Sequence, residues 1–165
     1  MELIQYLLDL SGIGRNRLQL RWVSAAEGQL FAKYVTEVSD ITQKLGPFDA
    51  DKFELPLAAV EQTLNSARIR WLLGLIKKVT EQGNVYKEKL KKEDFKKMLH
   101  QAAEEEYQKA LIMKVLEERP LSVKEMAKKT GLAVYTVSVR LNELERCNQA
   151  GLNKYSGNTP LFMSM

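Results

Sequence analysis

A single segment with the alternating pattern of a β-strand interrupts the helical N-terminal part of this chain. Apolar Leu18, Leu20 and Trp22 alternate with polar residues, which predicts a strand over 18–23 with one buried face. One strand cannot form a sheet, because both of its backbone edges would lack hydrogen-bond partners. We therefore expect another copy of this chain, or a different chain, to supply the neighbouring strand.

Helices are predicted on both sides of this strand. Leucine and isoleucine residues at helical spacing fill residues 1–10, and the glycines of segment 11–14 end that helix. Ser24 and Glu27 have the spacing of a capping box at the start of a second helix, from about Ala25, which the Gly-Pro pair at 46–47 ends. Residues 1–48 are thus predicted to form a helix–strand–helix segment, which is a truncated α/β fold.

The next part of the chain, residues 49–104, is predicted to be a helical linker region. Its first helix has Pro56 at a position typical of a helix start, and its apolar stripe continues to Val79. Residues 77–97 contain eight lysines and four acidic residues, and a further helix is predicted from about Glu93. We interpret these lysines as a solvated helix face.

Residues 105–165 have the pattern of a winged helix-turn-helix domain. An amphipathic helix ends before Pro120, and Ser122 with Glu125 forms a second capping box at the start of a short helix. Gly131 provides a tight turn before a third helix, and two short strands are predicted around residues 156–158. Three helices and a terminal hairpin are the elements of a winged helix. The predicted fold class is therefore mainly α with minor β.

The outward face of the third predicted helix allows two interpretations. An exposed apolar group of Val134, Tyr135 and Val139 favours a protein partner. The alternative is DNA binding, because a winged helix places this helix in the major groove and Arg and Asn are residue types that contact bases. The residues expected to contact DNA in that case are Tyr135, Thr136, Ser138, Arg140, Asn142 and, on the wing, Lys154.

The composition excludes several classes of protein. The chain has 165 residues, a net charge of +4, one histidine and one cysteine, Cys147. One cysteine excludes an internal disulfide and a self-contained iron–sulfur or zinc cluster of cysteines. The longest apolar runs, such as 71–76, are far shorter than the ~20 residues that span a bilayer, and no signal-peptide pattern is present. We expect a cytoplasmic protein without membrane insertion and without catalytic, cofactor-binding or metal-binding residues.

Several stretches of residues 2–48 carry a family resemblance. They are the helix 3–8 (LIQYLL), the segment 17–28 (RLQLRWVSAAEG), residues 31–32 (FA) and residues 45–47 (LGP), and the part from 21 to 28 is the most specific. These residues resemble the C-terminal part of the methyl-viologen-reducing hydrogenase delta (iron–sulfur) subunit family. Residues 68–74 and 83–86 are similar to the tail of longer family members, which end in a winged helix.

This resemblance implies a place in an electron-transfer complex of anaerobic metabolism. Family members pass electrons from a hydrogenase, formate dehydrogenase or similar donor into flavoprotein complexes of the heterodisulfide-reductase type, through a two-iron cluster. Their cluster cysteines lie upstream of the matched part, and Cys147 matches none of them. The expectation is no cofactor in this chain and an iron–sulfur cluster or a flavin in a partner subunit.

Two hypotheses of function follow. In the first, the chain is a non-catalytic accessory subunit of an oxidoreductase complex of the hydrogenase/heterodisulfide-reductase type. It would be the C-terminal half of a split delta subunit that completes the sheet of an iron–sulfur partner, and its winged helix would dock on the larger assembly. In the alternative, it is a DNA-binding transcriptional regulator, a homodimer that pairs through residues 18–23. The expected partner-interface residues are Leu18, Leu20, Trp22, Ser24 and Glu27, with Val134, Tyr135 and Val139 on the winged helix.

Overall fold

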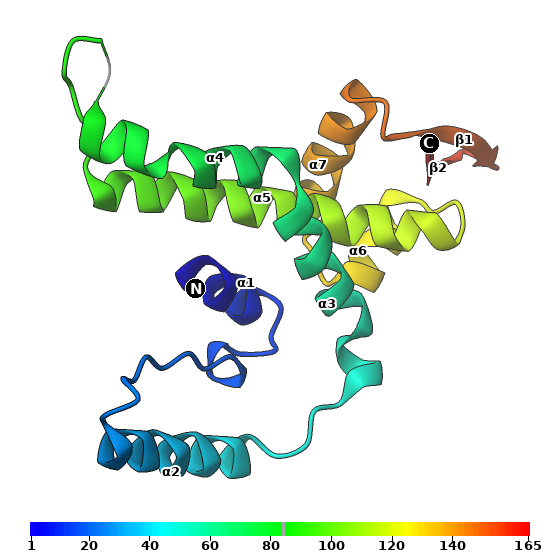
Figure 1. The fold of residues 1–165 in the computed structure, drawn as a ribbon. Helices are drawn as coiled ribbons and strands as arrows, with labels where there is room; N and C mark the ends of the chain where they lie inside the picture. The colour runs from blue at the N-terminus through cyan, green and yellow to red at the C-terminus, as the bar shows by residue number, and fades with distance from the viewer. Residues whose placement is uncertain (84) are drawn as a thin grey trace. The chain divides into compact units, whose positions relative to one another are not determined.

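The structure is a computed structural model that describes residues 1–83 and 85–165. It is mainly helical, and its described residues form one small antiparallel sheet, as predicted (Figure 1). The chain divides into two compact units, unit 1 (Met1–Glu54) and unit 2 (Leu55–Met165). The domain boundaries predicted after residues 48 and 104 stay predictions, and a helix crosses the second of them. Residue 84, part of the resemblance predicted for 83–86, lies outside the described residues.

Unit 1 begins with a helix and a glycine-rich turn. Helix α1 (Glu2–Leu10) buries three leucines and is followed by one turn of 3-10 helix, η1 (Arg15–Arg17). Gly14, between them, has a φ of 90°, a conformation that residues with a Cβ rarely adopt. The Asp9 carboxylate fixes the turn by accepting hydrogen bonds from the Arg15 backbone N–H at 2.7 Å and from its guanidinium at 2.5 Å. The helix therefore ends where the glycines predict.

The strand predicted over 18–23 is not formed. Leu18 is extended, with φ −116° and ψ 109°, but no described residue pairs with this segment in a sheet. The alternating side chains favour an extended backbone, whereas a strand also needs a neighbour that exchanges hydrogen bonds with it. The segment therefore begins with an extended backbone at Leu18, although no strand of the described chain lies beside it.

Helix α2 (Gly28–Leu45) starts later than the capping box predicts. The Glu27 carboxylate accepts a hydrogen bond from the Ser24 backbone N–H at 2.8 Å, which is half of the box. The other half would be a hydrogen bond from the Glu27 N–H to the Ser24 hydroxyl, and it is missing. Glu27 itself is the N-cap of α2, and no side chain caps the helix. The predicted end is correct: Gly46 has a φ of 67° and donates to the Thr42 carbonyl at 3.2 Å.

The apolar stripe predicted as one helix is divided into α3 (Ala50–Asn65) and α4 (Ala67–Lys77). Ser66 separates them, since its side chain accepts a hydrogen bond from the Ile69 N–H at 3.2 Å and caps α4. Pro56 lies inside α3, so its predicted place at the first helical position is wrong. The helix starts earlier because the Asp49 side chain accepts from the Lys52 N–H at 3.0 Å.

Helix α5 (Lys92–Glu118) unites the helix predicted near Glu93 with the amphipathic helix that ends before Pro120. A π-helical turn, η2 (Lys78–Gln82), and a loop connect α4 to α5, and α4 lies alongside α5 (Figure 1). Ten residues of α5 are buried. It is the helix against which the rest of unit 2 packs.

The C-terminal part of unit 2 contains the elements predicted for residues 105–165. Helix α6 (Val123–Thr130) has the complete capping box of Ser122 and Glu125, and Gly131 ends it with φ 73°. Helix α7 (Val134–Arg146) turns its apolar face inward as predicted. The core of buried residues shared by these helices and the hairpin is Ile112, Val115, Leu116, Leu121, Met126, Val137, Leu141, Leu144 and Ala150.

A hairpin closes this part of the chain. Strands β1 (Ala150–Ser156) and β2 (Thr159–Ser164) pair in antiparallel register around residues 157–158, close to the predicted turn. Leu121 joins them through two backbone hydrogen bonds of 2.9 Å with Phe162. The hairpin is thereby attached to the start of α6.

The Ser122 cap gives a test of this packing. The Ser122→Ala variant should unfold with a free energy lower by about 1 kcal/mol, because it removes the acceptor for the Glu125 N–H and the partner of the Glu125 carboxylate. Urea denaturation followed by circular dichroism measures the change. The control Ser138→Ala alters an exposed serine inside α7 and should leave stability within about 0.5 kcal/mol of wild type. Equal losses in both variants would contradict the capping role.

Candidate partner-binding site

Unit 1 exposes large apolar side chains around the unpaired segment. Trp22 is 83% exposed, Phe31 57%, Val35 51% and Leu20 47%. Val23 is also exposed, and together these five residues are named the apolar surface of unit 1. Large exposed apolar groups of this kind mark interaction sites.

Helix α2 contributes to this surface because it buries none of its residues. Its apolar side chains recur every three or four residues on one face, from Phe31 to Leu45. An amphipathic helix normally covers such a face with the rest of its own fold. In α2 no residue of this face is fully buried by the described chain.

The arginines of unit 1 hold the unpaired segment against α2. The Arg17 guanidinium donates hydrogen bonds to the carbonyls of Leu45 and Gly46 at 3.2 and 3.3 Å, and lies 5.4 Å from the centre of the Phe48 ring. The Arg21 guanidinium lies 5.8 Å from the ring centre of Tyr34. Trp22, which follows Arg21 directly, is thus displayed from an ordered backbone.

The structure places the predicted interface residues of unit 1 in two groups. Leu20, Trp22 and Ser24 are exposed, whereas Leu18 is half-buried and its carbonyl accepts a hydrogen bond from the Gln5 side chain at 3.2 Å. Glu27 is exposed, and its carboxylate accepts a hydrogen bond from the Ser24 backbone N–H. The apolar members therefore remain available to a partner.

The outward face of α7 also exposes apolar side chains. Tyr135 is 79% exposed and Val134 51%, while Val139 is half-buried. Of the residues expected on DNA, Ser138, Asn142 and Lys154 are exposed and Thr136 is half-buried.

Arg140 does not point outward as the DNA alternative requires. Its guanidinium donates to the Gln108 side chain at 3.0 Å and to Glu143 at 2.6 Å, and its side chain is 16% exposed. Because α7 turns this arginine toward α5, the strongest base-contacting candidate of the sequence serves the packing of two helices.

Arg140 belongs to a chain of ion pairs that joins three helices of unit 2. Glu143 also pairs with Lys109 at 3.2 Å, Lys109 pairs with Glu106 at 3.1 Å, and Arg68 of α4 reaches Glu105 at 2.8 Å. Burial alone would raise the pKa of Glu143, but hydrogen bonds from Arg140 and Lys109 outweigh it and lower that pKa. Burial would likewise raise the pKa of Glu105, but the hydrogen bond from Arg68 outweighs it and the pKa is lowered.

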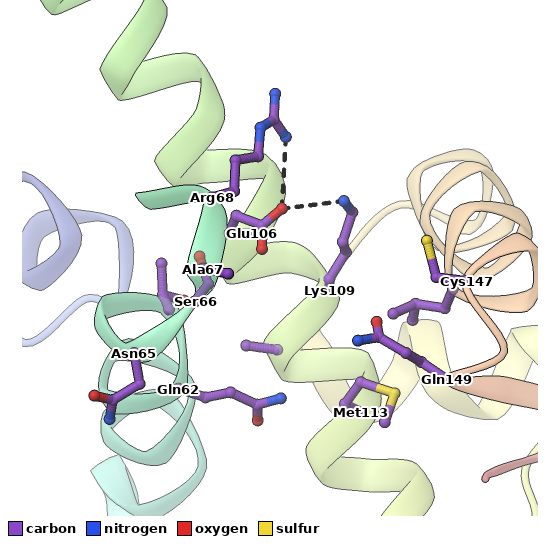
Figure 2. A pocket seen from close by; sticks show the side chains of 13 residues that line it. Gln62, Asn65, Ser66, Ala67, Arg68, Glu106, Lys109, Met113, Cys147 and Gln149 are labelled. Atoms are coloured by element: carbon purple, nitrogen blue, oxygen red, sulfur yellow. Dashed lines mark hydrogen bonds and ion pairs between the residues drawn. The ribbon is translucent and has the colours of Figure 1, made fainter. Parts of the chain in front are cut away.

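A pocket of about 410 Å³ lies beside these ion pairs (Figure 2). Glu106 accepts from both Arg68 and Lys109 on its wall, so these charges compensate one another. The Oε1 atom of Gln62 is buried in the lining and has no hydrogen-bond partner among the described groups. Cys147, the one cysteine of the sequence, is exposed at this pocket. The lining mixes polar and apolar side chains, and its charged members are Arg68, Lys109 and Glu106.

Two negative findings concern only residues 1–83 and 85–165. No group of three His, Cys, Asp or Glu side chains in this part of the chain could hold a metal ion. No helix there is sufficiently long and apolar to cross a membrane.

The decisive comparison concerns the segment that carries the apolar surface. Residues 1–46 match the family model of the methyl-viologen-reducing hydrogenase delta subunit. The resemblance predicted from residues 2–48 is confirmed for this segment. A curated relative from Archaeoglobus profundus, an iron-sulfur subunit of an F420-non-reducing hydrogenase, is 43% identical over 53 residues, which are 32% of this chain. The matched part spans about a third of that relative, 36% of its length, and no solved structure matches the chain.

Sequence reasoning missed the two features that organise the sites. The contacts of Arg17 with the end of α2 join residues 28 or more positions apart, and a local pattern does not contain them. The charges at 105, 106 and 109 on α5 and at 140 and 143 on α7 have the spacing of neighbours on one helix face, which could have indicated the ion pairs.

The ion pairs predict a pH dependence of stability. Since folding lowers the pKa of Glu143 below its ordinary 4.5, its contribution is complete above pH 4.5 and is lost as the pH falls toward the lowered pKa. The free energy of unfolding of wild type should therefore fall more steeply below pH 4.5 than that of Glu143→Gln. Denaturant titrations at several pH values measure this difference. Glu61→Gln, an exposed position of α3, should keep the wild-type slope; a parallel slope for Glu143→Gln would contradict the prediction.

Proposed function

We propose that this chain is a non-catalytic subunit of an electron-transfer complex of the hydrogenase type. The observation that carries the proposal is the coincidence of two features on residues 1–46. This segment matches the hydrogenase delta subunit model, and it displays Trp22, Leu20 and Phe31 to solvent from a fixed backbone. A segment built to pack against other elements, and left open, fits a subunit that completes its fold on a partner.

The unpaired backbone suggests how the partner binds. Residues 18–23 have alternating side chains and an extended start but no strand neighbour in the described chain. We expect them to add as a strand to the edge of a sheet in the partner, where backbone hydrogen bonds supply affinity and alternate side chains enter pockets. The apolar face of α2 would cover the new sheet.

The proposed partner is a redox protein that carries an iron–sulfur cluster or a flavin. The relative from Archaeoglobus profundus is named an iron-sulfur subunit, whereas the matched part of this chain contains no cysteine. We therefore expect the partner to transfer electrons and this chain to have a structural role. The C-terminal helices and hairpin, interpreted as a winged helix, would dock through Val134 and Tyr135 on a larger assembly of the heterodisulfide-reductase type.

Trp22 provides the test. Affinity purification of the full chain from native cells without oxygen should recover a protein with the visible absorption of an iron–sulfur cluster or a flavin, identified by mass spectrometry. Trp22→Ser should reduce that recovery about tenfold or more, because a central tryptophan typically contributes about 2 kcal/mol or more to an interface. Its melting temperature should stay at the wild-type value, because the side chain is already 83% exposed.

Trp71→Ser is the matched control, since Trp71 is 64% exposed on α4 in unit 2. This variant should retain the partner. Equal recovery with both variants would overturn the assigned interface. Recovery of the chain as a dimer with DNA, or of the chain alone without any redox protein, would overturn the proposed function itself.

A further inference from the structure

A loop with an apolar tip projects from unit 2 between η2 and α5. It lies at the end of the α4–α5 pair that points away from α6 and α7 (Figure 1). At this loop Val85 is 91% exposed and Tyr86 81% exposed. These two fractions are among the largest for apolar side chains of the described residues, so most of each side chain lies in solvent.

The base of the loop is fixed by hydrogen bonds. The Gly83 N–H donates to the Lys78 carbonyl at 2.8 Å, and the Leu90 N–H donates to the Val79 carbonyl at 2.9 Å. Gly83 has a φ of 84°, and a Cβ at this position would lie 2.8 Å from the Glu88 carbonyl oxygen. Both facts require glycine at this point. The two ends of the loop are therefore fixed at Gly83 and Leu90.

Lysines are concentrated in the residues on both sides of the tip in the sequence, and they are named the collar. The eight lysines of residues 77–97 are all exposed, and the same residues include four acids and no arginine. The ion pairs of Lys92 with Glu81 and of Lys97 with Asp94 have N–O distances of 3.9 Å and are open to solvent, so each of them is weak. The collar lysines are Lys77, Lys78, Lys87, Lys89, Lys91, Lys92, Lys96 and Lys97.

We propose that this loop docks the protein reversibly on an anionic membrane surface. Lysines near such a surface are attracted by its negative potential without needing a particular geometry. The tyrosine ring is a side chain that prefers the headgroup region, and the neighbouring valine adds apolar contact. Association of this kind is peripheral and does not require a membrane-spanning helix.

The use of lysine alone separates a lipid surface from an acidic protein as the occupant. Protein interfaces are enriched in arginine and depleted in lysine, because the planar guanidinium makes paired hydrogen bonds with carboxylates. Lysine is a hydrated point charge on a flexible stem, which suits a surface whose charges are mobile. The exposed side chains of Val85 and Tyr86 could insert into the headgroup region of a membrane, which pairing of surface charges alone would not require.

Sedimentation of the full chain with lipid vesicles tests this inference. Binding is expected to vesicles of phosphatidylcholine with about 30% phosphatidylserine, to be absent with phosphatidylcholine alone, and to weaken at high salt. The triple variant K89Q/K91Q/K92Q should bind about a hundredfold more weakly, at roughly fivefold for each lysine removed. Val85→Ser with Tyr86→Ser should weaken binding while preserving its salt dependence.

The control K44Q/K124Q/K154Q removes the same charge from exposed lysines outside the collar. It should bind like wild type, and melting curves verify that each variant is folded. Equal loss in both triple variants would show attraction by net charge alone and overturn the site. Binding to polyglutamate in preference to the anionic vesicles would instead assign the collar to an acidic protein. No binding of wild type to the anionic vesicles overturns the proposal and leaves the partner surface of unit 1 unaffected.

Discussion

The extended backbone that begins at Leu18, and that no described strand pairs, is the constraint on which the interpretation of unit 1 depends. An extended backbone presents N–H and C=O groups on both edges, and burying them without partners is costly. The structure avoids that cost by leaving the segment in solvent, and the consequence is that Trp22 and the face of α2 stay exposed as well. One missing neighbour thus accounts for both the irregular backbone and the uncovered helix.

The two units meet their packing needs differently. The C-terminal helices of unit 2 enclose a core whose largest side chains, such as Leu144 and Met126, are almost completely buried. Unit 1 fixes its chain with polar and cation–π contacts from Arg17 and Arg21, which position a surface without burying it. Such contacts orient a segment but leave its apolar side chains in solvent. That contrast is consistent with the proposal that unit 1 is completed by a partner.

The sequence predicts elements well where a local pattern determines them. Ser122 with Glu125, and Gly131, define α6 within the chain itself, and both behave as expected. Predictions failed where a distant group decides. The strand at 18–23 needed a neighbour that the described chain lacks, and Ser66 divided a helix whose apolar stripe continued past it. Arg140 was expected on the outward face of α7, but it donates a hydrogen bond to Gln108 on α5 and its side chain is mostly buried.

Several arginines of this chain make contacts within the protein, whereas the lysines of residues 77–97 are exposed on its surface. Arg17, Arg68 and Arg140 are bound to backbone carbonyls or carboxylates of the protein itself. Their forked donors satisfy several acceptors at once, so they suit fixed internal geometry. The lysines of 77–97 lie in solvent, where they act chiefly through their field. The net charge of +4 is not confined to one site. Residues 77–97, with eight lysines and four acidic residues, and residues 119–165, with seven basic and three acidic residues, each have a net charge of +4, and the proposed membrane contact uses the first of these two groups.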